Sequence, residues 1–281
     1  MSLFAILCRL SLLVIVVASS VTKSFAAEAL RPNIVYILAD DLGYGDIQAL
    51  NPMRGKIATP HLDRMAERGM VFTDAHSPSS VCTPTRYGIL TGRYAWRTHL
   101  QSGVLYGESP PLIAAECMTV PRLLQSHGYA TYGVGKWHLG LDWQRKTKEK
   151  FTAQEKEQAW DIDYSLPFES GPMARGFDHF FGISASLDMP PYVYLRDDRA
   201  TKIPTTHRTY IRKGAAAEGF EAEDVLPSLT SEVVQIVDQC AEKAKSGSPF
   251  FLYWALASPH TPIVPTSPWK GKSGLGDMAT L

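Results

Sequence analysis

Short apolar runs alternate with amphipathic segments along most of this chain. Continuous apolar runs that end in polar or glycine-rich positions are typical of strands buried on both faces of a sheet. Four such runs predict extended segments, at residues 33–38, 70–72, 129–134 and 250–256. The first run ends in two carboxylates, Asp40 and Asp41, as expected where a buried strand emerges into a loop.

Capping residues mark helix boundaries between these runs. A threonine at the N-cap, often followed by proline, and a glycine just past the last turn are typical helix boundaries. The N-cap threonines are Thr59, Thr83 and Thr119, and the closing glycines are Gly69, Gly92 and Gly128. Residues 231–245 form a further predicted helix with one apolar side. Strands separated by helices predict an α/β fold with a mainly parallel central sheet and helices on both faces.

Residues 141–227 interrupt this alternation. The segment opens with a charged stretch, residues 144–158, and continues with aromatic- and proline-rich sequence. Insertions of this length often line the substrate pocket of an α/β enzyme, although the aromatic residues could equally form a satellite core. The polar pocket candidates in the segment are Arg175, His179, Asp188, Arg196 and His207.

The N-terminal residues resemble a secretory signal peptide. The apolar run at residues 10–18 is shorter than the roughly 20 residues that span a bilayer, and small residues follow it. We therefore predict a signal peptide at residues 1–27 and export to a periplasm, a lysosome or the medium, with an uncleaved membrane anchor as the alternative. Three cysteines, Cys82, Cys117 and Cys240, would then remain in an oxidising compartment.

Composition excludes several classes of protein. The 281 residues contain 28 Lys+Arg and 28 Asp+Glu, and this balance argues against a generally basic nucleic-acid binder. Hydrophobic residues make up 45% and charged residues 20%, which is globular composition rather than a disordered or fibrous one. Four cysteines are too few for a disulfide scaffold in a chain of this length.

Polar residues follow three of the predicted strands where each strand ends. Asp40 and Asp41 follow the first strand, Lys136 and His138 follow the strand at residues 129–134, and His260 follows the last. Ligands of open α/β sheets bind beyond the carboxyl ends of the strands, so we expect these side chains at one edge. Paired carboxylates there suit Ca²⁺ or Mg²⁺. Taken singly, each residue also fits an ordinary structural or surface role.

A cysteine lies beside a predicted helix start in the motif Cys82-Thr-Pro84-Thr-Arg86. Free backbone N–H groups at a helix N-terminus, together with a guanidinium, can bind a tetrahedral oxyanion. A structural disulfide at Cys82 and a catalytic thiolate, whose pKa the helix end would lower, are the alternatives.

This motif, continued by LTGR at residues 90–93, resembles the signature of type I sulfatases in the alkaline phosphatase superfamily. GVGKWHLG at residues 133–140 resembles the second signature of that family. PNIVYILADDLGYGD at residues 32–46 and SPHTP around His260 agree with the family in order and spacing. The resemblance extends over residues 31–272.

The resemblance implies hydrolysis of a sulfate ester on an aryl sulfate or a sulfated carbohydrate. A maturation enzyme would oxidise Cys82 to formylglycine (3-oxoalanine), whose hydrate attacks the sulfur and then expels sulfate internally. Asp40, Asp41 and residue 82 would hold one divalent cation, usually Ca²⁺, with Mg²⁺ possible. Cys117 and Cys240 would be either paired or free.

The resemblance also implies a role for each remaining side chain. Arg86 would steady the diol, and Lys136 would bind the sulfate. His138 would accept a proton during release of sulfate, and His260 would bind the substrate and help to protonate the leaving oxygen. The alternatives are a phosphoester or phosphonate hydrolase of the same superfamily, or an inactive remnant that binds sulfated glycans.

The sequence departs from the family after His260. The family continues through a long stretch with an Asp-Asn pair and a later lysine, whereas this chain stops at Leu281. We therefore expect residues 31–281 to be the N-terminal part of a sulfatase catalytic domain, with residues 141–227 as its insertion. Such a chain should expose a sheet edge and apolar surface, and it should be poorly active or unstable alone.

Overall fold

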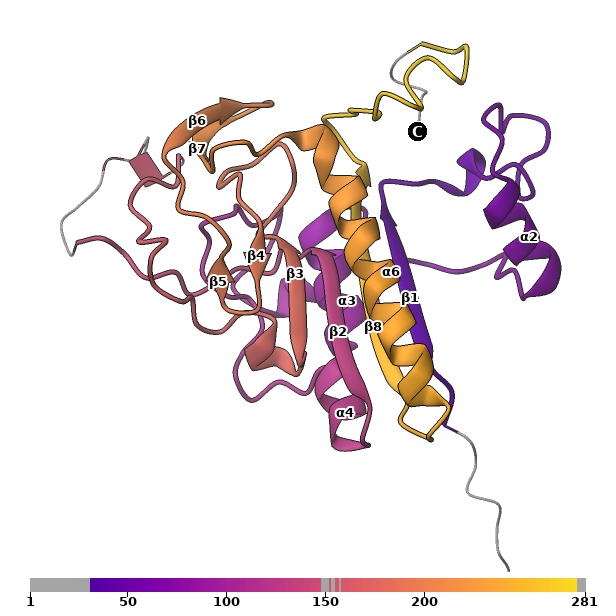
Figure 1. Ribbon diagram of the computed structural model, residues 1–281, viewed down its shortest axis with the longest axis horizontal. Coiled ribbons are helices and arrows are strands. Elements are labelled where there is room, and N and C mark those ends of the chain that lie inside the picture. The colour runs from indigo at the N-terminus through magenta and orange to yellow at the C-terminus, as the bar shows by residue number, and fades with distance from the viewer. Residues whose placement is uncertain (1–30, 148–151, 153–154, 157, 277–281) are drawn as a thin grey trace, which may run out of the picture. The chain divides into compact units, whose positions relative to one another are not determined.

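A six-stranded sheet with the order β1-β8-β2-β3-β4-β5 forms the centre of the fold (Figure 1). The structure is a computed structural model that describes residues 31–147, 152, 155–156 and 158–276, so the predicted signal peptide lies outside the described residues. The strands are β1 (Ile34–Asp40), β2 (Ala130–Lys136), β3 (His179–Ile183), β4 (Leu195–Arg196), β5 (Arg199–Ala200) and β8 (Phe250–Pro259). Strand β8 pairs in parallel with β1 and with β2, and β2 pairs in parallel with β3. The β3–β4 and β4–β5 pairs are antiparallel. The predicted mainly parallel sheet is confirmed.

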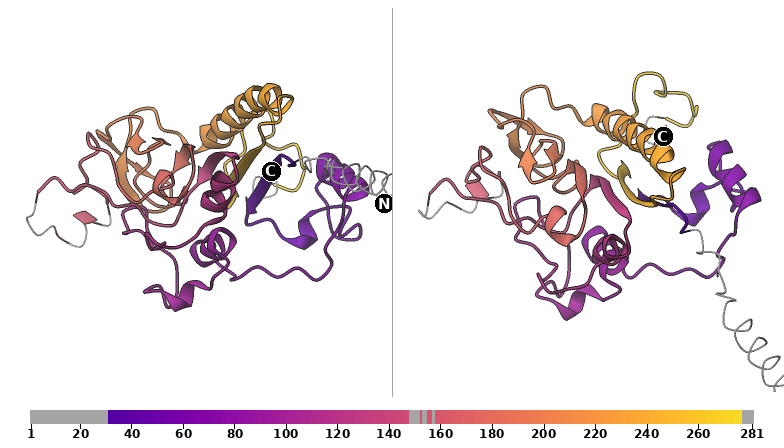
Figure 2. Two further views of the ribbon diagram at one scale, coloured as in Figure 1. Left: turned by 90° about the horizontal axis from the view of Figure 1, so that it is seen from below. Right: turned by 60° about the horizontal axis from the view of Figure 1, so that its bottom comes forward.

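Helices cover both faces of this sheet. Helix α6 (Val225–Ala244) lies on one face and α3 (Cys82–Thr91) on the other (Figures 1 and 2). The described residues also form α2 (Pro60–Arg68), α4 (Val120–Ser126) and the short 3-10 turns η1 (Tyr44–Asp46), η2 (Ala95–Arg97), η3 (Met173–Arg175) and η4 (Ala222–Asp224). A separate hairpin consists of β6 (Thr206–Thr209) and β7 (Lys213–Ala216). No helix in the described part of the chain is both long enough and apolar enough to cross a membrane.

Strand β8 lies between β1 and β2 beneath α6. Phe251, Leu252 and Tyr253 are buried, and α6 contributes Leu229 and Val233 to the same core. The continuous apolar run predicted at residues 250–256 is therefore a central parallel strand, as the pattern indicates.

Strand β1 lies at the edge of the sheet and is much less covered. Val35, Tyr36 and Ile37 expose 46%, 40% and 47% of their surface, although their sequence is as apolar as that of β8. The expected open sheet edge and exposed apolar surface are therefore found at β1.

One predicted strand and two predicted helix starts differ from the structure. Residues 70–72 form no strand, because no strand in the described part of the chain pairs with them, and they are exposed. Helix α3 begins at Cys82 rather than after Thr83, since the Thr83 hydroxyl accepts a hydrogen bond from Leu105 N instead of capping the helix. Helix α6 begins at Val225, six positions before Ser231, because proline is tolerated in a first helical turn, where Pro227 lies.

Residues 141–227 contribute strands to the main sheet that the sequence analysis did not predict. β3 pairs with β2 in parallel and extends the sheet on the side away from β1. The aromatic residues also form a satellite core, in which Trp143 packs edge-on against Tyr164 and Phe168. The satellite-core interpretation of these aromatic residues is therefore confirmed, while the pocket-lining interpretation stays a prediction. Cys117 and Cys240 are free and buried, so they do not pair.

Candidate active site

Three strand ends and one helix start meet at the carboxyl edge of the sheet. Asp40 is the last residue of β1, Lys136 is the last residue of β2, and His260 follows the last residue of β8. Cys82 is the first residue of α3. The backbone N–H of His260 donates to the carbonyl of Asp40, which joins two of these strand ends directly. The predicted convergence at one edge is what the parallel register produces.

A glycine lets β2 approach β8 just before Lys136. Gly135 has φ of 122°, and a Cβ atom there would lie 1.8 Å from the carbonyl oxygen of Ala255 on β8. Only glycine tolerates that backbone conformation at that distance. The close approach brings the Lys136 end of β2 next to the end of β8.

Arg86 connects all three strand ends from the first turns of α3. Its Nη1 donates to the carbonyl of Lys136 at 2.8 Å. Its Nη2 donates to Asp40 Oδ2 at 3.1 Å and to the carbonyl of Leu256 at 3.3 Å. The side chain is buried, so these bonds form in a region from which water is excluded. Arg86 therefore links β1, β2 and β8 by hydrogen bonds inside the protein.

Asp40 and Lys136 form a buried ion pair. Lys136 Nζ lies 2.5 Å from Asp40 Oδ2, the oxygen that Arg86 also contacts. Burial by itself raises the pKa of the Asp40 carboxyl, but the charges of Lys136 and Arg86 outweigh it and hold that pKa well below its ordinary value. Asp40 is therefore a carboxylate held between two cations.

Asp41 has a contrasting environment, because 72% of its side chain is exposed. Partial burial, followed by the hydrogen bond and charge of the adjacent Asp40, raises the pKa of the Asp41 carboxyl. Its Oδ2 lies 3.9 Å from Nε2 of His260. Adjacent carboxylates in the sequence thus have opposite pKa shifts.

The Cys82 thiol and the His260 ring shift each other's pKa. Burial raises the pKa of the Cys82 thiol, but the interaction with His260 and the charge of Lys136 lower it below its ordinary value overall. The interaction with the thiol raises the pKa of His260. Both shifts favour a thiolate beside an imidazolium. Nδ1 of His260 donates to the carbonyl of Thr261 at 2.7 Å and lies 3.0 Å from Ser186 Oγ.

His138 is fully buried and neutral. Its Nε2 donates to the carbonyl of Leu105 at 2.7 Å, so this nitrogen carries the ring proton. Its Nδ1 has no hydrogen-bond partner in the described part of the chain. Burial, followed by the charge of Lys136, lowers the pKa of His138 well below its ordinary value. An imidazole in this state presents a free lone pair that can accept a proton.

The donor set for a metal ion is limited. No cluster of three or more His, Cys, Asp or Glu side chains able to hold a metal occurs among the residues that the structure describes. Asp40 and Asp41 offer carboxylate oxygens, but Asp40 Oδ2 already contacts two cations. Calcium prefers six to eight oxygen ligands. The described residues therefore suit a hard cation in kind but do not complete a site for one.

The pocket candidates predicted in residues 141–227 occupy different places. Arg175 is buried and donates to the carbonyl of Ile113, so its guanidinium supports a loop. His179 stacks on Tyr132. Arg196 pairs with Glu232 of α6, and His207 accepts a hydrogen bond from Trp160 Nε1. Asp188 alone lies in a loop that contacts His260, through Ser186.

Two contacts in this site were missed by the sequence analysis. The carbonyl of Leu105 sets the tautomer of His138, and Ser186 contacts His260. Both contacts come from loops far away in the chain. The residue types carry no motif that could have identified them.

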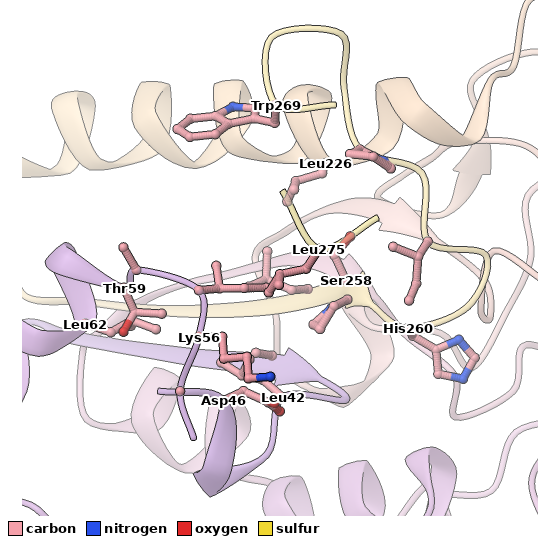
Figure 3. Close-up of a pocket in the computed structure, with 18 of the residues that line it drawn as sticks. Leu42, Asp46, Lys56, Thr59, Leu62, Leu226, Ser258, His260, Trp269 and Leu275 are labelled. Carbon is pink, nitrogen blue, oxygen red and sulfur yellow. The ribbon is translucent and has the colours of Figure 1, made fainter. Parts of the chain in front are cut away.

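An apolar cavity of about 450 Å³ adjoins the site at His260 (Figure 3). Its walls come from the segment after β1, the end of β8 and the segment that follows β8. The residues labelled in Figure 3 are Leu42, Asp46, Lys56, Thr59, Leu62, Leu226, Ser258, His260, Trp269 and Leu275. Cys82, Arg86 and Lys136 are not part of its lining, so the cavity lies beside the polar cluster and does not contain it.

Comparisons with known proteins agree with this arrangement. A family model described as Sulfatase matches residues 32–279. An N-acetylgalactosamine-6-O-sulfatase of Bacteroides thetaiotaomicron is 32% identical over 91% of this chain and 53% of its own length. Human arylsulfatase A is 33% identical over 89% of this chain and 45% of its own length. The chain therefore spans about half the length of the curated relatives it matches.

Solved structures show the same likeness in three dimensions. A structure described under the metabolism of multiple glycosaminoglycans by Bacteroides thetaiotaomicron has a TM-score of 0.74 and 29% identity, over 90% of this chain and 56% of its own. A sulfatase structure from Pseudoalteromonas sp. has a TM-score of 0.62 at 20% identity, over 89% of this chain and 48% of its own, and so supports the fold alone.

Proposed function

The chain belongs to the sulfatase family, and from that premise we propose that it hydrolyses sulfate esters of an aryl alcohol or a carbohydrate. The observation that carries the proposal is the convergence of Cys82, at the start of α3, with the strand ends that carry Lys136 and His260. Arg86 of the same helix bonds to the Lys136 carbonyl and to Asp40, and His260 N–H bonds to the Asp40 carbonyl. These groups combine a nucleophile position, a proton donor and two cations. Such a set suits the transfer of an anionic tetrahedral group.

Residue 82 is proposed to act as formylglycine made from Cys82 by a maturation enzyme. The hydrated aldehyde would supply one hydroxyl that attacks sulfur and a second whose deprotonation expels sulfate. Its position at the helix start, with a pKa lowered by neighbours, supports Cys82 as the modified residue. A plain thiolate whose pKa His260 lowers is the competing interpretation of Cys82.

The other side chains supply binding and proton transfer. Lys136 and Arg86 would balance the charge of the sulfuryl group, since both are held in place before a substrate arrives. His260, whose raised pKa favours the protonated ring, would donate a proton to the leaving oxygen. His138, neutral and with Nδ1 free of partners among the described residues, would accept the proton released with sulfate.

A divalent cation, Ca²⁺ or Mg²⁺, belongs to the proposal with Asp40, Asp41 and residue 82 as its ligands. The two carboxylates fall short of a full set, so no proton transfer described above depends on the ion. Calorimetric titration with calcium chloride tests this part by binding alone. Binding that is lost in Asp41→Asn supports the assignment, and unchanged binding in that variant opposes it.

The central experiment joins mass spectrometry to kinetics. The chain is expressed with a formylglycine-generating enzyme, and the peptide that carries Cys82 is analysed for conversion of thiol to aldehyde. Turnover of matched aryl sulfate and aryl phosphate esters is then measured. We expect the aldehyde and a preference for the sulfate. Cys117→Ala, which removes another free cysteine, serves as the matched control for Cys82→Ala.

Each alternative has its own outcome in this experiment. A preference for the phosphate ester would favour a phosphoester or phosphonate hydrolase of the same superfamily. An intact thiol at Cys82 would remove the formylglycine mechanism. Aldehyde formation without turnover of either ester would favour a protein that binds sulfated glycans without hydrolysing them.

Export is also part of the proposal. The apolar run at residues 10–18 and the small residues after it support a cleaved signal peptide. N-terminal sequencing of the protein recovered from outside the cytoplasm should begin near residue 28. A start at Met1 in a membrane fraction would favour the uncleaved anchor.

A further inference from the structure

One arginine outside the catalytic cluster is held by a buried carboxylate and an aromatic ring. Arg212 lies in the turn between β6 and β7. Its Nη1 donates to Asp188 Oδ2 at 2.5 Å, and its guanidinium lies 5.7 Å from the ring centre of Tyr106. Both supports come from loops that also contact the candidate active site.

The Asp188 support is connected to His260. Ser186 Oγ lies 3.0 Å from His260 Nδ1, and Met189 N donates to the carbonyl of Ser186 at 3.1 Å. Asp188 therefore belongs to the same tight turn as the residue that contacts His260. Arg212 is bound to this turn through two oxygens of Asp188, the carboxylate and the backbone carbonyl.

The Tyr106 support is connected to His138 and α3. The residue before it, Leu105, accepts a hydrogen bond from His138 and donates one to the Thr83 hydroxyl. Gly107 follows, and a Cβ atom there would lie 2.2 Å from the carbonyl oxygen of Pro190. The absence of that atom lets the loop of Tyr106 pack against the loop of Asp188. Arg212 thus lies where the two loops that border the site meet.

The guanidinium of Arg212 is partly exposed and has unused donors. The side chain is 43% exposed, whereas that of Asp188 is almost completely buried. Within the described part of the chain, only Nη1 donates hydrogen bonds, both of them to Asp188, so Nε and Nη2 are unused. The Nε and Nη2 edge of arginine matches two oxygens of a carboxylate or a sulfate.

We propose that Arg212, held by Asp188 above Tyr106, binds an anionic group on the sugar next to the one that carries the scissile sulfate ester. The anionic group is a carboxylate or a second sulfate. The inference rests on the proposed function, since it names the substrate class for that same site: an O-sulfated oligosaccharide with a negatively charged neighbouring unit. Arg212 is a specificity-determining residue.

The fixed position of this guanidinium distinguishes it from an ordinary surface arginine. An exposed arginine loses side-chain entropy when it binds a ligand, whereas Arg212 is already ordered by Asp188 and Tyr106. The carbonyl of Arg212 also accepts a hydrogen bond from the hydroxyl of Tyr192, which anchors its backbone. A preordered donor pair binds an anion at lower entropic cost.

Arg196 provides a matched control within the same chain. It is also partly exposed, and its guanidinium lies 4.5 Å from the ring centre of Phe181. Its Nη1 and Nη2 both bond to the carboxylate of Glu232, at 2.8 Å and 2.9 Å. Arg196 therefore has the same chemistry as Arg212, but its donor pair is already occupied.

The test compares Arg212→Gln with Arg196→Gln in the full native polypeptide, matured at residue 82. Three O-sulfated disaccharides are used: one with a uronic carboxylate, the same compound with that carboxylate reduced to an alcohol, and one with a second sulfate instead. An aryl sulfate is the fourth substrate. For Arg212→Gln we expect kcat/KM to fall about 10–100-fold on either charged disaccharide, through KM, as loss of a charge-assisted pair predicts.

The pattern across substrates decides the result. The loss on a charged disaccharide should exceed the loss on the reduced disaccharide and on the aryl sulfate at least tenfold. Arg212→Lys should recover part of it, and Arg196→Gln should lose no discrimination. The carboxylate and second-sulfate compounds identify which anion is preferred. Equal losses on all four substrates, or no loss on any, would overturn the proposal.

A binding measurement separates this inference from the proposed function. The same disaccharides are titrated calorimetrically into Cys82→Ala, with and without Arg212→Gln. Weaker binding of only the charged disaccharides in the double variant supports the role of Arg212, even if no sulfate ester is hydrolysed. Equal affinities in the two proteins contradict it, even if sulfate esters are hydrolysed.

Discussion

Strands β1 and β2 flank β8 on opposite sides, and both end in charged residues of the candidate site, but only β2 is enclosed by the fold. Thr131 to Lys136 are buried on β2, whereas Val35, Tyr36 and Ile37 on β1 are exposed. The last residues of the two strands do not follow this difference, because Asp40 is buried like its ion-pair partner Lys136.

The comparison shows that two kinds of force position the two parts of the site. On the β2 flank, apolar packing holds the strand and carries Lys136 into place. On the β1 flank, Asp40 is held by two cations and by the backbone bond from His260. The site should therefore respond to loss of charge on the β1 flank and to loss of packing on the β2 flank.

Asp40→Asn should have the largest effect, because it leaves Lys136 and Arg86 buried without a counter-charge. We expect a loss of about 3–5 kcal/mol in the free energy of unfolding and at least about a 10²-fold fall in aryl sulfate turnover. Urea unfolding followed by circular dichroism and steady-state kinetics measure the two effects. Asp41→Asn, at an exposed position, should change stability by less than about 1 kcal/mol. Equal destabilisation by both variants would contradict the comparison.

Val134→Ala should have the next largest effect and has a paired control on the other flank. Val134 on β2 and Ile37 on β1 both lie opposite Trp254 of β8 in the sheet register. Val134 is buried, so its truncation should cost about 2 kcal/mol. Ile37→Ala removes more atoms but from an exposed side chain, and should cost less than about 1 kcal/mol. If Ile37→Ala lowered the free energy of unfolding in urea more than Val134→Ala, the side chains of β1 would be shown to be packed.

Arg86→Lys keeps the positive charge beside Asp40 but removes the hydrogen bonds that the guanidinium makes to three groups at once. An ammonium cannot reach the carbonyls of Lys136 and Leu256 and the Asp40 carboxylate together. We expect a loss of about 1–2 kcal/mol in the free energy of unfolding, from carbonyls left without donors. Thermal unfolding measures this change. A loss as large as that of Asp40→Asn would indicate that the hydrogen bonds, rather than the charge, hold the β1 end.

Ser186→Ala should have the smallest effect, because it removes one neutral contact with His260. We expect aryl sulfate turnover to fall about twofold to fivefold, which corresponds to roughly 0.5–1 kcal/mol. The reference variant is Ser228→Ala, which removes a hydroxyl hydrogen-bonded to Tyr194 instead. Steady-state kinetics measures aryl sulfate turnover in both variants. An equal loss of turnover in both would contradict a role of Ser186 in orienting His260.

Local signals in the sequence predicted most of the regular structure near the site. The apolar runs identified β1, β2 and β8, and Thr119 caps α4 with its hydroxyl, which accepts from Arg122 N as expected. Such signals work because strand burial and helix capping depend on neighbouring residues. Residues 70–72 show the limit, since an apolar run becomes a strand only where another strand is available to pair.

The sequence also predicted which residue types meet in the candidate site. Asp40 and Lys136 end strands, His260 follows one and Cys82 begins a helix. Parallel topology brings such positions together. The strand β3 was not predicted, because its aromatic sequence is compatible with a loop core as well as with a strand. Its pairing with β2 depends on residues remote in the chain.

The sequence by itself determined the fold class, the strand ends that carry charge and the position of the cysteine at a helix start, because each is a property of a short segment. Only the tertiary structure decided how these groups affect one another. Arg86 and Lys136 reach Asp40 across 46 and 96 positions of the chain. The tautomer of His138, the opposite pKa shifts of Asp40 and Asp41, and the support of Arg212 by Asp188 arise from such contacts. They depend on how the folded chain excludes water and brings distant charges within bonding distance.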